Sequence, residues 1–157
     1  MFKKILVAID PSEYSSNAVP TAIEVARRFE AEVFVVHVHE HDRGRAIAYP
    51  LMTREDAEKL VADAVETVKA AGVSADGVVY HGFIGEVPER IMEVAKEQGS
   101  DLIVMGSRGL SDVAGALLGS VAHKVIRLAQ VAVLVDRTQH PLELATAGAR
   151  ATATAVF

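Results

Sequence analysis

The sequence predicts an α/β fold in which helices cover both faces of a five-stranded parallel β-sheet. Two observations carry this prediction: five short, largely apolar runs recur along the chain, and amphipathic stretches of helical length separate them. An uninterrupted apolar run is typical of a strand that is buried on both faces. Strands that alternate with helices form parallel β-α-β units, and five such strands fit a doubly wound sheet.

Five apolar runs supply the expected strands, which are residues 5–9, 33–38, 77–81, 102–105 and 131–135. The first reads Ile-Leu-Val-Ala-Ile and the fourth Leu-Ile-Val-Met, with no polar residue in either. The third run is the weakest of the five. Apolar residues at helical spacing predict four helices, around residues 19–29, 57–68, 91–95 and 122–129.

Local signals place the helix ends. Pro20 lies near the expected start of the first helix, where a missing N–H costs least. Thr53 followed by Asp56 resembles a capping box before the second helix. Pro88 suits the first turn of the third helix, which we expect to end near Gly99.

Length and composition predict one domain followed by a tail. The chain has 157 residues, close to the ~150-residue prior for a single domain. We place this domain at residues 1–137. From Asp136 onward the alternation stops and Ala, Thr, Gly and Pro dominate, so residues 138–157 are expected to form an appended C-terminal tail.

Composition also excludes several classes of function. The chain has no cysteine, which rules out disulfides, thiol catalysis and thiolate metal sites and suits a reducing cytoplasm. A net charge of −5 argues against a nucleic-acid binder. The apolar run after Lys4 ends at Asp10, shorter than the ~7–15 residues of a signal peptide's apolar region, and no stretch approaches the ~18 residues of a membrane span. We expect a cytoplasmic protein without membrane insertion.

A glycine-bearing segment after the fourth strand carries the chemistry. Gly106-Ser-Arg-Gly109 is followed by nine residues and then by Gly119-Ser120, which opens the fourth helix. The glycines allow tight turns or the close approach of a ligand, and a helix N-terminus favours an anion. Ser120 can donate to a phosphate oxygen, and Arg108 can neutralise one. The segment is neither a Walker A loop nor a dinucleotide fingerprint, and its spacing alone leaves open that the glycines only make turns.

This spacing resembles the G-2x-G-9x-G-(S/T) signature of ATP-binding universal stress proteins. Three further segments strengthen the resemblance: residues 2–10 are similar to the family's first strand, residues 100–109 to its fourth strand and turn, and residues 118–122 to its helix entry. The resemblance covers about residues 2–137. Two features depart from it: the proline that often precedes the fifth strand is missing, and the tail has no counterpart.

The resemblance implies a flavodoxin-like strand order of 3-2-1-4-5, with a nucleotide across the carboxyl ends of strands one and four. The implied contacts are Asp10 with the adenosine portion, Val38 with adenine, Met105 and Gly106 with the base and ribose, and Gly109, Gly119, Ser120 and Val121 with phosphates, with Arg108 close by. From the residues alone, a turn or helix-capping role for Asp10 in Asp10-Pro11-Ser12 stays open as the lesser alternative.

The function implied is that of an ATP-binding sensor in the stress response, which acts through nucleotide-dependent conformation or dimerisation on an unknown protein partner. Mg²⁺ can accompany the ATP through phosphate oxygens and water. The resemblance also implies a homodimer through the fifth strand, whose bare apolar edge invites pairing, and we expect the tail to reach across that dimer.

Two alternatives stay open beside the sensor. One is an enzyme, either a slow ATP hydrolase or an adenylyl-transfer enzyme, and the other is a dimerisation module without nucleotide. Transfer chemistry needs a placed base and cationic or metal stabilisation of the phosphate. Around the signature there is Arg108 but no lysine and no carboxylate pair, so we favour binding over turnover.

Three alternating histidines form a second candidate site. His37, His39 and His41 would share one face if the second strand continued, and with Glu40 or Asp42 they would offer zinc ligands. We expect instead that the third of them lies in the loop after the strand and that the group binds no metal. His81 is expected to be isolated at a strand end, and His123 on a helix surface.

Overall fold

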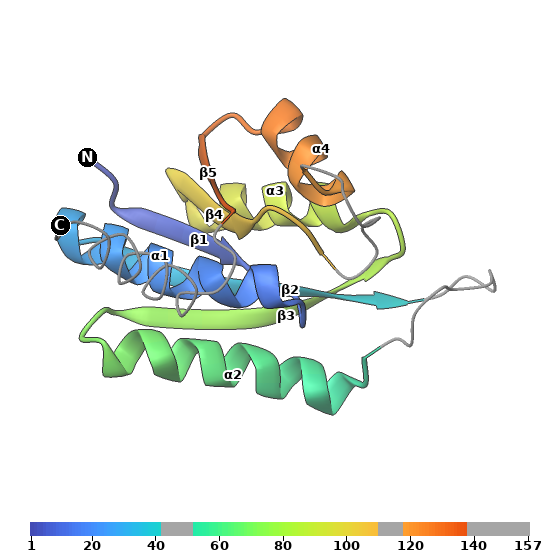
Figure 1. Cartoon of the computed structure of the whole chain (residues 1–157), viewed down its shortest axis with the longest axis horizontal. Coiled ribbons are helices and arrows are strands. Elements are labelled where there is room, and N and C mark those ends of the chain that lie inside the picture. Colours follow the sequence, from blue (N-terminus) through green and yellow to red (C-terminus); the bar gives the residue numbers. More distant parts are fainter. Residues whose placement is uncertain (42–51, 110–117, 138–157) are drawn as a thin grey trace, which may run out of the picture.

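The computed structural model describes residues 1–41, 52–109 and 118–137, and it confirms the predicted fold class (Figure 1). In chain order the elements are β1 (Lys4–Ala8), α1 (Glu13–Phe29), β2 (Glu32–His41), α2 (Arg54–Ala70), β3 (Ala75–Phe83), α3 (Val87–Gln98), β4 (Leu102–Gly106), α4 (Ser120–Leu128) and β5 (Ala132–Asp136). The strand order is β3-β2-β1-β4-β5, and all neighbouring strands are parallel. The predicted tail, residues 138–157, lies outside the described residues.

Each face of the sheet carries its own apolar core. Ile5 and Val7 of β1 pack on the side of α1 and α2, whereas Leu6 and Ala8 pack on the side of α3 and α4. Side chains of a strand point alternately to its two faces, so a strand covered on both sides must be apolar throughout. This is why β1 and β4 could be recognised directly.

The capping signals of the second and third helices hold. Thr53 caps α2: its Oγ1 accepts from the Asp56 amide at 3.1 Å and donates to Asp56 Oδ2 at 2.7 Å. Pro88 lies in the first turn of α3, and Gly99 ends that helix with φ 65, in the left-handed region that glycine adopts at low cost. No helix in the described ranges is both long and apolar enough to cross a membrane.

The first helix begins earlier than expected. Ser12 caps it by accepting from the Ser15 amide, so α1 starts at Glu13 and Pro20 lies inside the helix rather than near its start. The prediction was wrong because the first turns contain mostly polar or small residues. Ser15 is one of them, and it is only 3% exposed. A polar residue is tolerated at this buried position because the Ser15 hydroxyl accepts a hydrogen bond from the Asp10 amide at 2.6 Å.

The second and third strands are longer than predicted. They pair from Val33 with Ala75 as far as His41 with Phe83, so His41 belongs to β2 and not to the following loop. The same register places His81 opposite His39, which corrects the expectation that His81 is isolated. Backbone hydrogen bonds extend the ladder where side chains are polar, and apolar patterning cannot report this.

Candidate functional site

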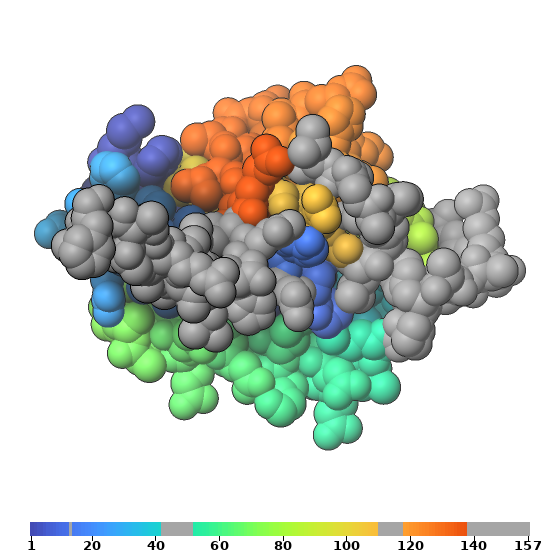
Figure 2. Space-filling view, in the orientation of Figure 1, coloured from blue at the N-terminus to red at the C-terminus, as the bar shows by residue number. Residues whose placement is uncertain are grey.

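A cavity opens where β1, β2 and β4 end, at the point where the strand order reverses. Of the residues implied by the resemblance, those that line it are Asp10, Val38, Met105, Gly106, Arg108, Gly109, Ser120 and Val121. Figure 2 shows the segment after β4 (gold) lying against the beginning of α1 (blue) on this side of the molecule. The topology thus brings together residues that are more than a hundred positions apart in the chain.

Asp10 follows β1 and does two things. Its Oδ1 accepts from the Ser12 amide at 2.9 Å and from the Ser12 hydroxyl, which shapes the turn into α1. Its Oδ2 makes no hydrogen bond to any described residue. The turn reading of Asp10 is therefore correct, and it leaves one carboxylate oxygen available at the cavity wall.

Gly106 ends β4 where the strand passes the first turn of α1. A Cβ built on it would lie 2.5 Å from the Tyr14 carbonyl oxygen and 2.7 Å from its carbonyl carbon. Real Cβ atoms do not approach backbone so closely, and Gly106 does not have positive φ. Its lack of a side chain thus serves helix–strand contact and not a tight turn.

Arg108 is held against Tyr14 of α1. Its guanidinium lies 5.1 Å from the centre of the tyrosine ring, and Nη1 donates to the tyrosine hydroxyl at 3.1 Å. A guanidinium over an aromatic face is attracted by the ring quadrupole. Tyr14 therefore positions the positive charge that lines the cavity.

The beginning of α4 forms the wall next to Arg108. Ser120, Val121 and Ala122 of its first turn line the cavity, and first-turn N–H groups have no acceptor within a helix. Gly119 caps the helix but does not line the cavity: its N–H donates to the Ser107 carbonyl oxygen at 2.7 Å. The amides and the dipole of α4 make this wall favourable to anions.

His37 lines the cavity from β2, and its environment favours the neutral imidazole. Its Nδ1 is 2.9 Å from the Ile9 carbonyl oxygen, which can only accept, so Nδ1 carries the proton. Burial lowers the pKa of His37, and this effect exceeds the opposite one of the Ile9 hydrogen bond and the Asp10 charge. The His37 side of the cavity therefore resists protonation, whereas Asp10 and Arg108 bring charge to other parts of its lining.

Sequence reasoning missed several residues of this site. Tyr14 and Met52 take part in it although they belong to no motif, and His37 was considered only as a metal ligand. Tyr14 was not singled out because its contact depends on the close passage of β4 and α1. Met52 precedes α2 and reaches the cavity only because the chain returns there after residues 42–51, which lie outside the described residues.

The other two histidines of β2 belong to a second group, of which His39 also lines the cavity. His39 and His41 gather with His81 of β3, so one nitrogen of each lies within 4.8 Å of the others. Burial lowers the pKa of His81, and the neighbouring His41 and His39 lower it further. The expectations that His41 lies in the loop after the strand and that His81 is isolated were therefore both wrong. His123 is exposed on α4, as predicted.

Comparison with known proteins places the chain in a family. A model of the universal stress protein family matches residues 1–137. Universal stress protein YxiE of Bacillus subtilis (strain 168) is 33% identical over 154 residues, which cover 87% of this chain and 100% of that protein.

Solved structures agree with this placement. The structure of the protein MJ0577 has a TM-score of 0.72 at 25% identity and covers 89% of this chain and 99% of that one. A universal stress protein solved in complex with cAMP has a TM-score of 0.67 at 26% identity, over 88% of this chain and 99% of that one. The chain therefore belongs to the universal stress protein family.

Proposed function

We propose that this protein binds ATP in the cavity at the ends of β1, β2 and β4 and acts as a nucleotide-dependent regulator in the cytoplasmic stress response. One observation carries the proposal. A hydrogen-bond acceptor at Asp10 and an anion-favouring wall at Arg108 and the start of α4 face the same cavity. A nucleotide has the complementary order of groups, with ribose hydroxyls in the middle and phosphates at one end.

The base and ribose end is the apolar side of the cavity. Val38, Ile91 and Met105 line it, and aliphatic side chains of this kind bury an adenine ring. Asp10 accepts from a ribose hydroxyl through its Oδ2, which makes no hydrogen bond to a residue of the described ranges. Ionised carboxylates accept hydrogen bonds and repel phosphates, so Asp10 also fixes the direction in which the nucleotide lies.

The phosphate end is the side of α4. The amides of Val121 and Ala122 and the hydroxyl of Ser120 donate there, while Arg108 supplies positive charge. Mg²⁺ fits this arrangement as an ion bound mainly to phosphate oxygens and water. The relative solved with cAMP, a phosphorylated adenine nucleoside, supports a ligand of this class.

Calorimetric titration with ATP, ADP, AMP and adenosine tests the proposal. We expect affinity to increase with phosphate number. Asp10→Asn should weaken all four ligands by a similar factor, whereas Arg108→Ala should weaken ATP more than adenosine. Asp63→Asn is the matched control, because Asp63 is exposed on α2 and pairs only with Lys59 among the described residues.

The same titration separates the alternatives. Absence of heat with every ligand would contradict the proposal and favour a dimerisation module without nucleotide. Rapid phosphate or AMP release from bound ATP would favour an enzyme, either a hydrolase or an adenylyl-transfer enzyme. Binding without release supports the sensor.

We further propose that the protein forms a homodimer through β5 and that this dimer presents the nucleotide state to a protein partner. β5 is an edge strand of the sheet, with Val133, Leu134 and Val135 only partly buried. Such an apolar edge pairs readily with a second copy. Sedimentation that shows only monomer at every concentration, with and without ATP, would contradict the dimer. Deletion of residues 139–157 that leaves dimer affinity unchanged would contradict a role for the tail.

A further inference from the structure

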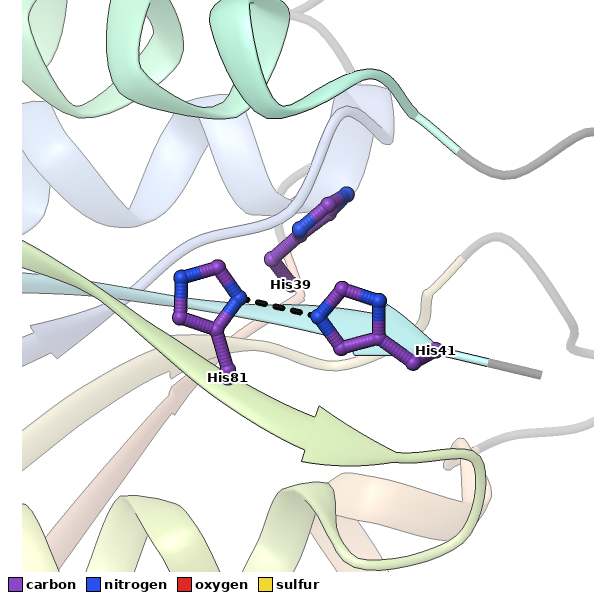
Figure 3. Close-up of side chains that lie close together, drawn as sticks. All are labelled: His39, His41 and His81. Atoms are coloured by element: carbon purple, nitrogen blue, oxygen red, sulfur yellow. Dashed lines mark hydrogen bonds between the residues drawn. The ribbon is translucent and has the colours of Figure 1, made fainter. Parts of the chain in front are cut away.

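Three histidine rings converge where β2 and β3 end, on the face that α2 covers (Figure 3). His39 and His41 are two residues apart on β2 and so point to the same face. His81 lies opposite His39 on β3. The ring centres are 4.8 Å apart for His39 and His41, 5.1 Å for His41 and His81, and 5.6 Å for His39 and His81.

The nitrogens of two exposed rings already meet. His41 Nε2 lies 2.9 Å from His81 Nδ1, so one of these nitrogens carries a proton and donates it to the lone pair of the other. A neutral imidazole can carry its proton on either ring nitrogen. If the donor ring carries it on its other nitrogen instead, both facing nitrogens have free lone pairs directed to the space between the rings. Tetrahedral zinc with Zn–N bonds of about 2.0–2.1 Å places its nitrogens about 3.4 Å apart. Small rotations of these solvent-exposed rings reach that spacing.

His39 is oriented in advance. Its Nε2 lies 2.7 Å from the Met52 carbonyl oxygen, which can only accept, so Nε2 carries the proton and Nδ1 keeps a lone pair. His39 is 93% buried, being 7% exposed, and its buried Nδ1 has no hydrogen-bond partner in the described structure. A buried acceptor left unpaired is costly and calls for an explanation. Histidines that bind metals characteristically donate their other N–H to a carbonyl, as His39 does.

The surrounding charges permit a cation. The positive charge of Arg54 disfavours charge on His81, but Arg54 Nε forms a salt bridge with the Glu58 carboxylate at 2.8 Å. The positive N-terminus of α2 is opposed by Glu55 and Asp56 in its first turn. No uncompensated positive charge from these groups therefore faces the rings.

We propose that His39, His41 and His81 bind a zinc ion, with water in the fourth position. Three neutral imidazoles suit zinc and its neighbours in the transition series, whereas Mg²⁺ requires oxygen ligands. The site is thus distinct in chemistry from any magnesium that accompanies the nucleotide. His39 also lines the nucleotide cavity, so the two sites share one wall.

The test is a calorimetric titration of the metal-free full chain with Zn²⁺ in the absence of nucleotide. We expect one zinc per chain, and at least a ~100-fold loss of affinity in His41→Ala and in His81→Ala, since loss of a partner that only orients a ligand already costs 10–100-fold. Both residues are exposed, so neither substitution empties the core. His123→Ala is the matched control, because it removes one exposed histidine from α4.

Zinc should also raise the midpoint of thermal unfolding in the wild type and in His123→Ala, but not in His81→Ala, because a ligand stabilises only the state that binds it. Mg²⁺ should produce neither heat nor a shift. Wild-type zinc affinity in His81→Ala, an equal loss in His123→Ala, or no zinc binding at all would each overturn the proposal. Because no nucleotide is present, none of these results depends on the ATP site.

Discussion

The amide of Gly119 donates to the carbonyl oxygen of Ser107 at 2.7 Å, which joins the two ends of the glycine-bearing segment. The Ser107 amide in turn donates to the Asp136 carbonyl oxygen at 2.8 Å. The ends of β4 and β5 and the start of α4 are thus connected through the backbone of one buried serine. This connection places the first turn of α4 against the cavity regardless of the course of residues 110–117.

The first prediction concerns Gly119→Val. Gly119 has φ −73 and ψ 162, an extended conformation that valine adopts readily, so the fold and the bond to Ser107 should survive. The new side chain would lie beside the amides of Ser120 and Val121 and obstruct a phosphate. We expect ATP binding to be abolished in calorimetry while the circular dichroism spectrum stays unchanged. Wild-type ATP affinity in Gly119→Val would contradict the phosphate assignment. The ATP affinity of Gly119→Ala should lie between those of the wild type and Gly119→Val.

Gly106→Ala should act on stability first. Its Cβ would meet the Tyr14 backbone, which cannot turn aside as a side chain can, so we expect a loss near the upper end of the overpacking range, about 3 kcal/mol. Gly72→Ala is the comparison, because its Cβ would meet open space. Only the positive φ of +80 is unfavourable for alanine there, and we expect it to lower the free energy of unfolding by about 1 kcal/mol. Urea denaturation gives both free energies of unfolding. An equal or smaller loss at Gly106 would show that the contact with α1 relaxes freely.

The glycines of the segment from Gly106 to Gly119 show which features could be predicted from the sequence and which could not. The spacing of Gly106, Gly109 and Gly119 identified the segment, but it could not distinguish a turn from a close approach. Gly106 turned out to serve packing against α1, because the register of β4 and the start of α1 together determine what a Cβ would meet. Information of this kind lies in two elements at once, and no local pattern contains it.

The strands divide in the same way. β1 and β4 are covered on both faces, so their apolar runs predicted the bounds of these strands to within one residue. The last residues of β2 and β3 are polar or exposed, and only their pairing shows that they are strand. The sequence could show that His39 and His41 would share a face, but not that His81 joins them, since that depends on the register that places His39 opposite His81.

Tyr14 should matter for ATP although no motif contains it. Tyr14→Leu removes both the ring under the Arg108 guanidinium and the hydroxyl that accepts from it. We expect ATP affinity to fall about twofold to fivefold, the equivalent of 0.5–1 kcal/mol for a partly exposed cation–π contact, with adenosine affinity unchanged. Tyr14→Phe should lose less because it keeps the ring. Tyr80→Phe is the matched control, since the Tyr80 hydroxyl donates to Glu97 outside the cavity. An equal loss for adenosine would mean that Tyr14 supports the cavity in general and not Arg108.

The last prediction concerns pH and the contact between α3 and α4. Glu89 of α3 and Lys124 of α4 form a salt bridge between the two helices. The hydrogen bond from Lys124 lowers the pKa of Glu89 below its ordinary value near 4.5. The folded state thus favours ionised Glu89, so the pair contributes stability above pH 4.5 and loses it as the pH falls through the lowered pKa.

Glu89→Gln should therefore reduce the free energy of unfolding at pH 7 and match the wild type at the acid end. Both side chains are 45% exposed, so solvent screening keeps the effect below about 1 kcal/mol. Denaturant titrations at pH 7 and pH 3 measure it, and added salt should reduce it at pH 7. Glu93→Gln is the control, because the ion pair of Glu93 in the described part of the chain is with Arg90 of its own helix. A Glu89→Gln deficit that persisted at pH 3 would assign the loss to packing and not to the ion pair.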